Sequence, residues 1–371
     1  MVTSAAYVDE LRRLGLAAGL DAVGVASAEP FTAARRVMTE RKAAGLHGSL
    51  RFTYGNPERA TDPSRALPGA QALVVGARSY RRRAHRPDTG QPHARVASYA
   101  WADHYRPLRE ALGQMARRLE VDGWRARVLA DDNALVDREA ATRAGLGWYG
   151  KNTNVLLPGR GSWFVLGSVI TDATLPAATE RVADGCGPCR RCLPACPTGA
   201  LVAPGVLDAR RCLAALVQAP GAFPVELRAA LGDRLYGCDD CQDVCPPNRV
   251  GERDRPPSPA DEGDDPWVSL LALLSQSDDQ LLVHYGRWYI PRREPRYLRR
   301  NALVVLGNVG DGSDPAVAAA LRGAVADADP LVRAHALWAA HRLGRADIVD
   351  ERLAHEHDAT VLADVRAWAG S

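Results

Sequence analysis

All eight cysteines of this 371-residue chain lie between Cys186 and Cys245. The first group, 186-CGPCRRCLPACP-197, has the spacing C-x2-C-x2-C-x3-C-P. The second group, 238-CDDCQDVCP-246, has the spacing C-x2-C-x3-C-P, and Cys212 stands alone between the two. In bacterial ferredoxins the first spacing places three thiolates on one iron–sulfur cluster and the fourth, before the proline, on the other cluster. The pattern therefore predicts two [4Fe–4S] clusters.

Applying this crossover assigns every thiol to a cluster. Cluster one takes Cys186, Cys189, Cys192 and Cys245, and cluster two takes Cys196, Cys212, Cys238 and Cys241. Each cubane takes four thiolates, so none of the eight cysteines is left over. Because two clusters in one small module relay single electrons, the rest of the chain is expected to hold the group that accepts them.

Three other uses of the cysteines compete with the clusters. Disulfides are disfavoured in a chain expected to be cytoplasmic, and the proline-flanked C-x2-C-x2-C-x3-C run does not favour structural zinc. Residues 188–192 match P-C-x-x-C, which is half of a zinc deaminase signature. The other half, H-x-E, is missing, because none of the nine histidines is followed two places later by glutamate.

The remaining composition is that of a soluble globular protein long enough for two or three domains, with 46% hydrophobic and 25% charged residues. No apolar run approaches the roughly 18 residues of a transmembrane helix. The start, MVTSAAYVDELRRLG, lacks the basic end and apolar stretch of a signal peptide. A cytoplasmic protein is therefore expected. The net charge of +3 identifies no partner, and only two lysines occur, Lys42 and Lys151, so nearly all positive charge is arginine.

The segment before the cysteines predicts an α/β domain large enough to bind a cofactor. Hydrophobic periodicity predicts helices over residues 4–18 and 107–123 and strands over residues 22–27, 71–79 and 125–130. Helical composition continues over residues 133–145. Residues 153–171 are rich in β-branched and aromatic side chains, which predicts a strand pair around a Pro-Gly turn.

The stretch 145-GLGWYGKN-152 resembles two nucleotide motifs but fits the context of neither. The dinucleotide fingerprint G-x-G-x-x-G needs a strand before it and a helix after it, and here the predicted order is reversed. The P-loop needs Ser or Thr where Asn152 stands. The stretch therefore predicts a helix-to-strand turn in which Gly145 ends the helix.

Asp131 and Asp132 follow the strand predicted over residues 125–130. Ligands of open α/β sheets bind at such strand ends. One interpretation is that Asp132 or Asn133 only caps the following helix. A cap needs one acidic or amide residue, so the second aspartate remains a candidate for chemistry.

The C-terminal part is predicted to be helical beyond a polar, proline-rich linker at residues 251–274. Arg299-x-x-Ala302-Leu303 recurs 34 residues later as Arg333-x-x-Ala336-Leu337, which suggests HEAT-like repeats over residues 275–371. The run 287-RWYIPRREPRYLRR-300 holds six arginines, three aromatic residues and one acid. RNA phosphates and stacked bases need such a combination, and a solvated arginine-rich helix face is the alternative.

Several segments together resemble the epoxyqueuosine reductase family: both cysteine groups, 67-LPGAQALVVG-76, 99-YAWADHY-105, 145-GLGWYGKNT-153, 231-LGDRLYGCDDCQDVCP-246 and 300-RNALVVLGN-308. The resemblance spans nearly the whole chain. It implies a cobalamin-dependent iron–sulfur oxidoreductase of queuosine synthesis, which reduces epoxyqueuosine to queuosine in tRNA with electrons passing from two [4Fe–4S] clusters to cobalamin. It also implies an α/β cobalamin-binding domain at residues 1–177, a ferredoxin-like two-cluster domain at 178–250 and the HEAT-like repeats.

Single residues acquire expected roles. The family's Asp-x-x-Pro-x-x-Glu motif corresponds to 131-DDNALVD-137, so Asp131 matches the proton-donating aspartate. Candidate cobalamin contacts are Asp131, Lys151, Asn152 and Tyr99, and candidate contacts for the tRNA carrying epoxyqueuosine are Arg292, Arg293, Arg296 and Arg299. An external one-electron donor of flavodoxin or ferredoxin type is expected as a further partner. A monomer away from membranes is expected.

The chain also departs from the family pattern. Ala134 and Asp137 replace the motif's proline and glutamate, the order Asp-Tyr-His is Asp103-His104-Tyr105, and Pro247 replaces a tryptophan. The segment 213-LAALVQA-219 replaces one of Ser-Tyr-Leu-Thr-Ile-Glu type. Two alternatives therefore stay open. One is a corrinoid iron–sulfur reductase of another, small-molecule substrate, similar to reductive dehalogenases, and the other is an electron-transfer protein of ferredoxin type.

Overall fold

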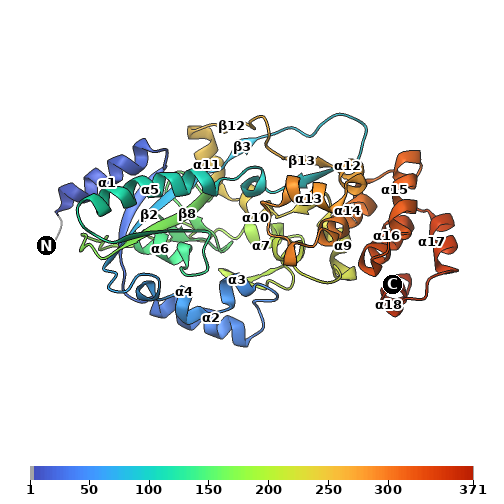
Figure 1. Ribbon diagram of the computed structural model, residues 1–371, viewed down its shortest axis with the longest axis horizontal. Coiled ribbons are helices and arrows are strands. Elements are labelled where there is room, and N and C mark those ends of the chain that lie inside the picture. The colour runs from blue at the N-terminus through green and yellow to red at the C-terminus, as the bar shows by residue number, and fades with distance from the viewer. Residues whose placement is uncertain (1–3, 371) are drawn as a thin grey trace. The chain divides into compact units, whose positions relative to one another are not determined.

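The computed structural model describes residues 4–370, which form two compact units (Figure 1). Unit 1 comprises the chain up to Arg83, then Ala102–Arg210 and Asp240–Pro259. Unit 2 comprises Ala84–Trp101, Arg211–Asp239 and the chain from Ala260 onward. Within the described part of the chain, no helix is both long and apolar enough to cross a membrane.

Unit 1 is built on a four-stranded sheet in the order β1-β2-β8-β5. The strands are β1 (Ala22–Ser27), β2 (Ala72–Ser79), β8 (Phe164–Thr171) and β5 (Ala126–Ala130). The central strands β2 and β8 are almost wholly buried, which explains their nearly continuous runs of small and β-branched residues. Helices α1 (Ala5–Ala17) and α5 (Tyr105–Val121) contact each other and the sheet, and α6 (Asp137–Arg143) also packs on it (Figure 1).

Every strand pair in this sheet is antiparallel. Asp131 was predicted to lie at a strand end of an open α/β sheet. It follows β5, which is instead an edge strand of an antiparallel sheet, paired only with β8.

The predicted helices over residues 4–18 and 107–123 and the predicted strands over 22–27, 71–79 and 125–130 are present within two residues at each end. Two predictions were wrong in detail. Helix α6 begins at Asp137 rather than near Asn133, because residues 132–136 form a turn whose Val136 N–H donates to the carbonyl of Ala60. Residues 153–171 do not form one strand pair: β7 (Val155–Leu156) pairs with β6 (Trp148–Tyr149), whereas β8 joins the main sheet.

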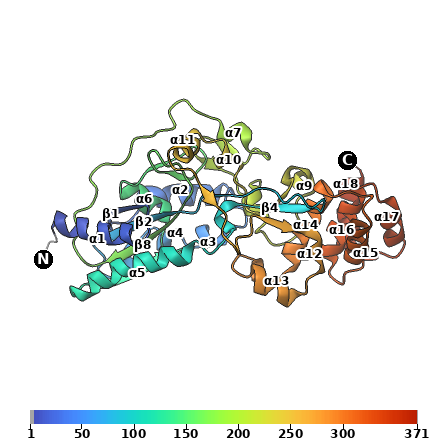
Figure 2. The same cartoon turned by 90° about the horizontal axis from the view of Figure 1, so that it is seen from above.

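The smaller elements of unit 1 surround the sheet and carry the cysteine segments. They are α2 (Thr32–Ala43), α3 (Arg51–Tyr54), α4 (Pro57–Ala60), η1 (Pro63–Arg65), β3 (Arg82–Arg83), α7 (Cys192–Ala195), β9 (Leu201–Ala203), β10 (Val206–Leu207), α10 (Asp240–Asp243), α11 (Pro246–Asp254) and β12 (Ser258–Pro259). Helices α7 and α10 lie side by side (Figure 2).

Unit 2 combines a three-stranded sheet with a helical array. The sheet has the order β11-β4-β13, formed by β11 (Arg234–Tyr236), β4 (His93–Val96) and β13 (Trp267–Ser269). The helices are η2 (Ser98–Ala100), α8 (Leu213–Leu216), α9 (Val225–Leu231), α12 (Leu270–Ser275), α13 (Asp278–Tyr285), η3 (Pro291–Arg293), α14 (Arg296–Val309), α15 (Pro315–Val325), α16 (Pro330–Arg342), α17 (Ala346–Leu353) and α18 (Ala359–Ala369). The segment expected as a linker, residues 251–274, contributes β12, β13 and α12.

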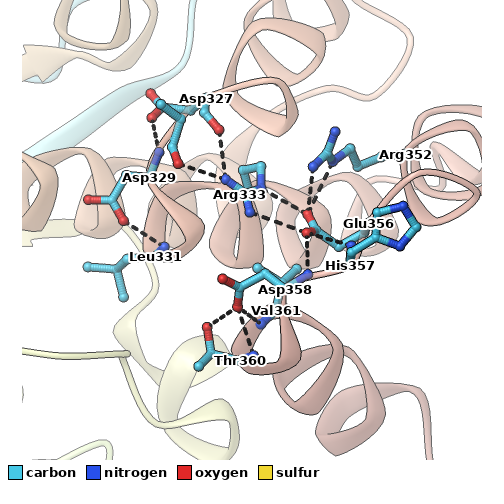
Figure 3. Close-up of polar contacts among 11 residues, drawn as sticks. Asp327, Asp329, Leu331, Arg333, Arg352, Glu356, His357, Asp358, Thr360 and Val361 are labelled. Atoms are coloured by element: carbon cyan, nitrogen blue, oxygen red, sulfur yellow. Dashed lines mark hydrogen bonds and ion pairs between the residues drawn. The ribbon is translucent and has the colours of Figure 1, made fainter.

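A buried ion pair ties the last helices of unit 2 together (Figure 3). Arg333 on α16 donates to both carboxylate oxygens of Glu356, at 2.8 and 3.2 Å, and to the carbonyls of Asp327 and Ala328. Arg352 on α17 donates to Glu356 at 2.8 Å. These guanidinium bonds, Arg333 first, outweigh the opposing effect of burial and lower the pKa of Glu356 to about 2. The carboxylate is therefore charged in the folded protein at any ordinary pH.

Replacing Glu356 by Gln should destabilise the C-terminal helices by about 3–5 kcal/mol, because the Arg333 charge would stay buried without its counter-charge. Hydrogen exchange of the α16 and α18 backbone amides at pH 7 measures the change. The contribution of Glu356 is fully present above its ordinary pKa near 4.5 and is lost as the pH falls toward 2. The matched control is Asp347→Asn, which breaks the pairs of the half-exposed Asp347 with Arg322 and Arg345 and should change protection little. Equal effects of the two substitutions would contradict this account.

Candidate functional site

The four cysteines assigned to cluster one line a single cavity in unit 1. Cys186, Cys189, Cys192 and Cys245 surround a space of about 80 Å³ together with Lys151, Asn152, Leu156, Gly185, Arg191, Pro246 and Pro247. Burial, followed by the nearby thiols, raises the pKa of Cys245 to about 11, and the same causes raise the pKa of Cys192. None of the eight cysteines, all of which lie in the described part of the chain, forms a disulfide. Thiols gathered in this way fit a group that takes thiolate ligands.

The cysteine segments take their shape from local backbone rules. Cys245 has an extended conformation at the N-cap of α11, and Pro246 occupies the first helical turn, where a missing N–H costs nothing. Cys196 is likewise extended and precedes Pro197. Burial would raise the pKa of Cys196, but hydrogen bonds from Thr198 and from the Ala200 N–H, at 3.2 Å from the sulfur, outweigh it and lower the pKa. A thiolate is thus already stabilised at Cys196.

The remaining cysteines divide between the two units. Cys196 and Cys241 belong to unit 1, whereas Cys212, at the N-cap of α8, and Cys238 belong to unit 2. The assignment of these four thiols to cluster two stays a prediction.

The stretch 145-GLGWYGKN-152 joins helix α6 to the β6–β7 hairpin, as the sequence predicted. Gly145 has a φ of +72°, and the N–H groups of Gly145 and Leu146 donate to Thr142 and Ala141, which is the Schellman ending of a helix. A side chain at Gly150 would collide with Leu156 across the hairpin, at 2.1 Å from its Cδ1. The glycines therefore serve a tight turn between α6 and β7.

This hairpin turn holds the cysteine segments. The Lys151 ammonium donates to the carbonyls of Gly187 and Cys189, at 2.5 and 2.9 Å. Asn152 is buried, and its amide donates to the carbonyl of Cys241 at 3.4 Å. Both were expected near cobalamin, and that contact stays a prediction beside the role that the structure gives them. The spacing of the motif did not indicate the cysteine contacts.

A second group of polar residues in unit 1 surrounds Asp131. Asp131 follows edge strand β5 with a φ of +55°, in the left-handed region that few non-glycine residues adopt. Crowding by protein atoms raises the pKa of its carboxyl, Arg109 opposes that shift, and Asp132 and Asp103 add to it. Much of the residue is nevertheless exposed. Asp131 is thus a strained, accessible carboxyl that holds its proton more tightly than usual.

Asp137 and Tyr105 lie within electrostatic range of Asp131. Burial and then the charge of Asp131 raise the pKa of Asp137 well above its ordinary value, and its Oδ1 is buried without a hydrogen-bond partner among the described residues. Burial, followed by Asp131 and Asp137, also raises the pKa of Tyr105. Asp132 does not cap α6; its carboxylate instead accepts from the Ala134 N–H at 2.8 Å within the turn. The capping interpretation was therefore wrong.

The predicted RNA-contacting arginines fall into two kinds, all in unit 2. Arg292 and Arg293 are exposed and have φ values of +51° and +56°. Arg296 pairs with Glu294 at 2.6 Å, and Arg299 pairs with Asp278. Nearby Tyr289 is 59% exposed. Of these four arginines, only Arg292 and Arg293 therefore have guanidinium groups without a carboxylate partner among the described residues.

Tyr99, the fourth candidate cobalamin contact, belongs to unit 2. Its hydroxyl accepts a hydrogen bond from Gln218 at 3.1 Å, and its ring lies 6.3 Å from the Tyr236 ring. Gln218 belongs to the segment 213–219 that follows Cys212. A contact between Tyr99 and cobalamin stays a prediction.

Residues that the sequence did not single out hold the segment after Cys212 in place. Arg300 is fully buried and donates to the carbonyls of Leu216, Val217, Ala219 and Gly221, at 2.6–3.2 Å. Asn301 donates to the carbonyls of Val217 and Leu235. The motif 300-RNALVVLGN-308 was the available signal, because a paired Arg-Asn at the start of an apolar helix is unusual for a solvent face.

Comparison with known proteins adds four findings. The family model described as "4Fe-4S double cluster binding domain" matches residues 185–248. The chain is 36% identical to the epoxyqueuosine reductase of Pseudomonas aeruginosa, over 81% of this chain and 85% of that protein. A solved epoxyqueuosine reductase with an epoxyqueuosine-modified tRNA-Tyr stem loop has a TM-score of 0.86 at 29% identity, covering 97% of each chain. The same values describe a Bacillus subtilis epoxyqueuosine reductase whose catalytic aspartate loop is swung out of the active site.

Anaerobic reconstitution is expected to load about eight irons per chain, four for each cubane. Cys196→Ala should disturb cluster two and leave cluster one, because Cys196 belongs by the crossover to the second set. Cys245→Ala should do the reverse. Iron analysis and electron paramagnetic resonance of the reduced proteins measure both outcomes. A Cys196→Ala protein that retains two intact cubanes would overturn the assignment.

Proposed function

The chain belongs to the epoxyqueuosine reductase family, and from this we propose that it reduces epoxyqueuosine to queuosine in the anticodon loop of tRNA. The support is similarity over most of the chain at 36% identity, together with the likeness to a reductase solved with an epoxyqueuosine-modified tRNA stem loop. The reaction converts the epoxide to an alkene and water, so it consumes two electrons and two protons. The protein has to deliver both.

The electron-carrying groups proposed are two [4Fe–4S] clusters and cobalamin. The donor set around cluster one fits, because four thiols share one cavity. The surroundings of Asp131 fit a site that faces a further group, because a strained accessible carboxyl lies in electrostatic range of a buried Asp137 oxygen that has no partner among the described residues. When bound, the clusters supply single electrons and the corrinoid supplies a strongly reducing cobalt centre.

We assign the proton to Asp131. An alkoxide leaves poorly, so the oxygen of the opening epoxide must receive a proton as its carbon–oxygen bond breaks. A carboxyl can supply it near neutral pH only if its pKa is raised, and the surroundings of Asp131 raise it. The B. subtilis relative with its aspartate loop swung out supports a mobile loop at this position. The left-handed backbone of Asp131 is strain of the kind found at functional sites.

Arg109, Asp137 and Tyr105 set the charge around this acid. Arg109 favours the ionised form of Asp131, and so it stabilises the carboxylate left after proton transfer, whereas Asp132 and Asp103 oppose ionisation. Asp137 and Tyr105 both hold their own protons tightly, which keeps further negative charge away from Asp131. The site is then restored when solvent protonates the exposed Asp131.

The tRNA surface proposed is the arginine–aromatic run of unit 2. Arg292 and Arg293 carry exposed guanidinium groups on a strained turn, and Tyr289 offers an exposed ring for stacking. The helices that follow are proposed to be HEAT-like repeats. In support, α14, α16 and α18 contact one another in sequence, and α15 and α17 pack against α16.

The apolar segment 213–219 favours a small-molecule substrate over tRNA only if it forms part of the substrate site. Leu213, Ala215, Leu216 and Val217 are instead buried in the core of unit 2. Packing therefore accounts for their apolar character. Incubation of the reduced protein with epoxyqueuosine tRNA, followed by nucleoside analysis, tests the proposed function, and queuosine must appear.

Asp131→Asn should retain both clusters and bound cobalamin and lose about 10²–10⁴-fold in turnover, the usual contribution of general acid catalysis. Asparagine keeps the size of the side chain and tolerates the left-handed backbone, so the loss reports on the proton. Wild-type turnover should fall as the pH rises through the raised pKa of Asp131, because the acid is then ionised. Asp132→Asn is the matched control and should stay active, since an amide oxygen can also accept from Ala134. A fully active Asp131→Asn protein would show that another group donates the proton, and Tyr105 would be the next candidate.

Replacing Arg292 and Arg293 by Ala should weaken binding of the tRNA stem loop and flatten its salt dependence. A phosphate that no longer contacts an arginine keeps its counterions, so fewer counterions are released on binding. Replacing Arg296 and Arg299 should affect binding less, because their guanidinium groups already pair with Glu294, Asp329 and Asp278. Fluorescence anisotropy at several salt concentrations measures both. An unchanged salt slope in the first variant would assign the run to a solvated surface.

A further inference from the structure

The segment that carries three ligands of cluster one also presents unpaired positive charge. Arg190 and Arg191 lie between Cys189 and Cys192, and both are exposed. Among the described residues neither makes an ion pair or a side-chain hydrogen bond, whereas many other arginines of the chain pair with carboxylates. Arg191 also lines the cavity of the cluster-one cysteines. The positive charge of Arg191 therefore lies at the cavity of the cluster-one cysteines in space and not only in sequence.

The cluster-one cavity lies directly under this surface. Gly185, Gly187 and Pro188, which continue the same segment, are exposed as well. A third arginine, Arg249, is exposed on α11 four residues after Cys245, and among the described residues its guanidinium reaches only the carbonyl of Asp243. The nearest acid on the cysteine segment is Asp184, whose carboxylate accepts from the Cys186 N–H. Asp240 and Asp243 lie on α10, which packs against α7, so the positive charge at the cavity rests on Arg190 and Arg191, which have no carboxylate partner among the described residues.

The position of the charged segment is fixed from within. Lys151 donates to the carbonyls of Gly187 and Cys189, so the backbone that carries Arg190 and Arg191 is anchored on its inner side. A fixed positive surface over a buried redox centre suits a partner that must dock briefly and reproducibly. Electron transfer between protein-bound centres falls steeply with distance, which makes the thinnest cover over a cluster the best place of entry.

We propose that Arg190, Arg191 and Arg249 form the docking surface for a small acidic one-electron carrier protein, and that electrons enter the chain at cluster one. This rests on the proposed function only in that the reaction needs two electrons. In each docking event the carrier is oxidised by one electron and cluster one is reduced from the 2+ to the 1+ state. Two such events supply one epoxide reduction, and the two protons of that reaction enter separately. Opposite charge accelerates such encounters at low salt.

The test follows reduction of the clusters by a flavodoxin in its fully reduced form, mixed anaerobically in a stopped-flow spectrometer. No tRNA is present, so failure of the proposed tRNA reaction cannot affect the result. Arg190→Glu with Arg191→Glu should lower the second-order rate constant at low salt by about tenfold or more, and its decline with added salt should disappear. Calorimetric titration with oxidised flavodoxin should show weaker binding. Arg190→Lys with Arg191→Lys keeps the charge and should keep the rate.

Two controls make the result specific. Arg13→Glu with Arg117→Glu makes the same change in net charge at exposed arginines on α1 and α5, helices that lie apart from α7 and α10 (Figure 2), and should leave the rate nearly unchanged. Reduction by methyl viologen radical, a small cation that needs no acidic docking surface, should not slow in the Arg190 and Arg191 variant. Iron analysis verifies that both clusters are assembled. If they are not, Arg190→Gln with Arg191→Gln replaces the charge reversal.

Two outcomes would overturn the proposal. The first is a rate of reduction by flavodoxin that is the same in the Arg190 and Arg191 variant as in the wild type. The second is a variant that binds the tRNA stem loop more weakly while accepting electrons normally, which would make this surface part of the RNA site.

Discussion

The contact between Lys151 and the carbonyls of Gly187 and Cys189 is the interaction on which the arrangement of the cysteines in unit 1 depends. The cysteine segment 186–192 lies before the four-residue helix α7, which begins at Cys192, and it takes its position from a cation on a neighbouring hairpin. Hydrogen bonds from an ammonium group are stronger than those between neutral groups, and this one spans two carbonyls of the same segment. Asn152, the next residue, extends the contact to the second cysteine group through Cys241. One turn thus links the sheet to both cysteine groups.

Unit 2 uses a similar device at the other cysteine-bearing segment. Arg300 is buried among carbonyls without a carboxylate, and burial lowers the pKa of its guanidinium to about 9, so it remains charged at neutral pH. Four carbonyls of residues 216–221 share that charge. In both units a single side-chain cation therefore organises irregular backbone that strands and helices do not stabilise. Lys151, which has this role in unit 1, is one of only two lysines in the chain.

The sequence predicted the helices and strands that show a clear hydrophobic pattern within their own residues. It missed the strands whose pairing partners are far away along the chain. The apolar runs of β1 and β2 and the periodicity of α1 and α5 were sufficient to locate these elements, whereas β8 was merged with β7 into one predicted strand pair. The sheet β11-β4-β13 was missed because its strands are three or four residues long and pair across more than a hundred residues of chain, from His93 to Ser269. Helix α6 was predicted to begin too early because residues 133–136 have helical composition but form a turn, in which the N–H groups of Ala134 and Val136 donate to Asp132 and Ala60. For the site, cysteine spacing predicted the ligands of the clusters and resemblance predicted the role of Asp131, and both assignments stay predictions. The roles of Lys151, Asp137 and Arg300 could not be predicted, since each depends on backbone or carboxyl groups that only the folded chain brings near.

The central claim is that this protein converts epoxyqueuosine to queuosine in tRNA. The most direct measurement is mass-spectrometric nucleoside analysis of tRNA from a strain that lacks the gene, beside the same strain carrying the gene again. The account predicts that the deletion strain accumulates epoxyqueuosine and contains no queuosine, and that the restored gene reverses both. Unchanged queuosine in the deletion strain, with no accumulation of the epoxide, would contradict it.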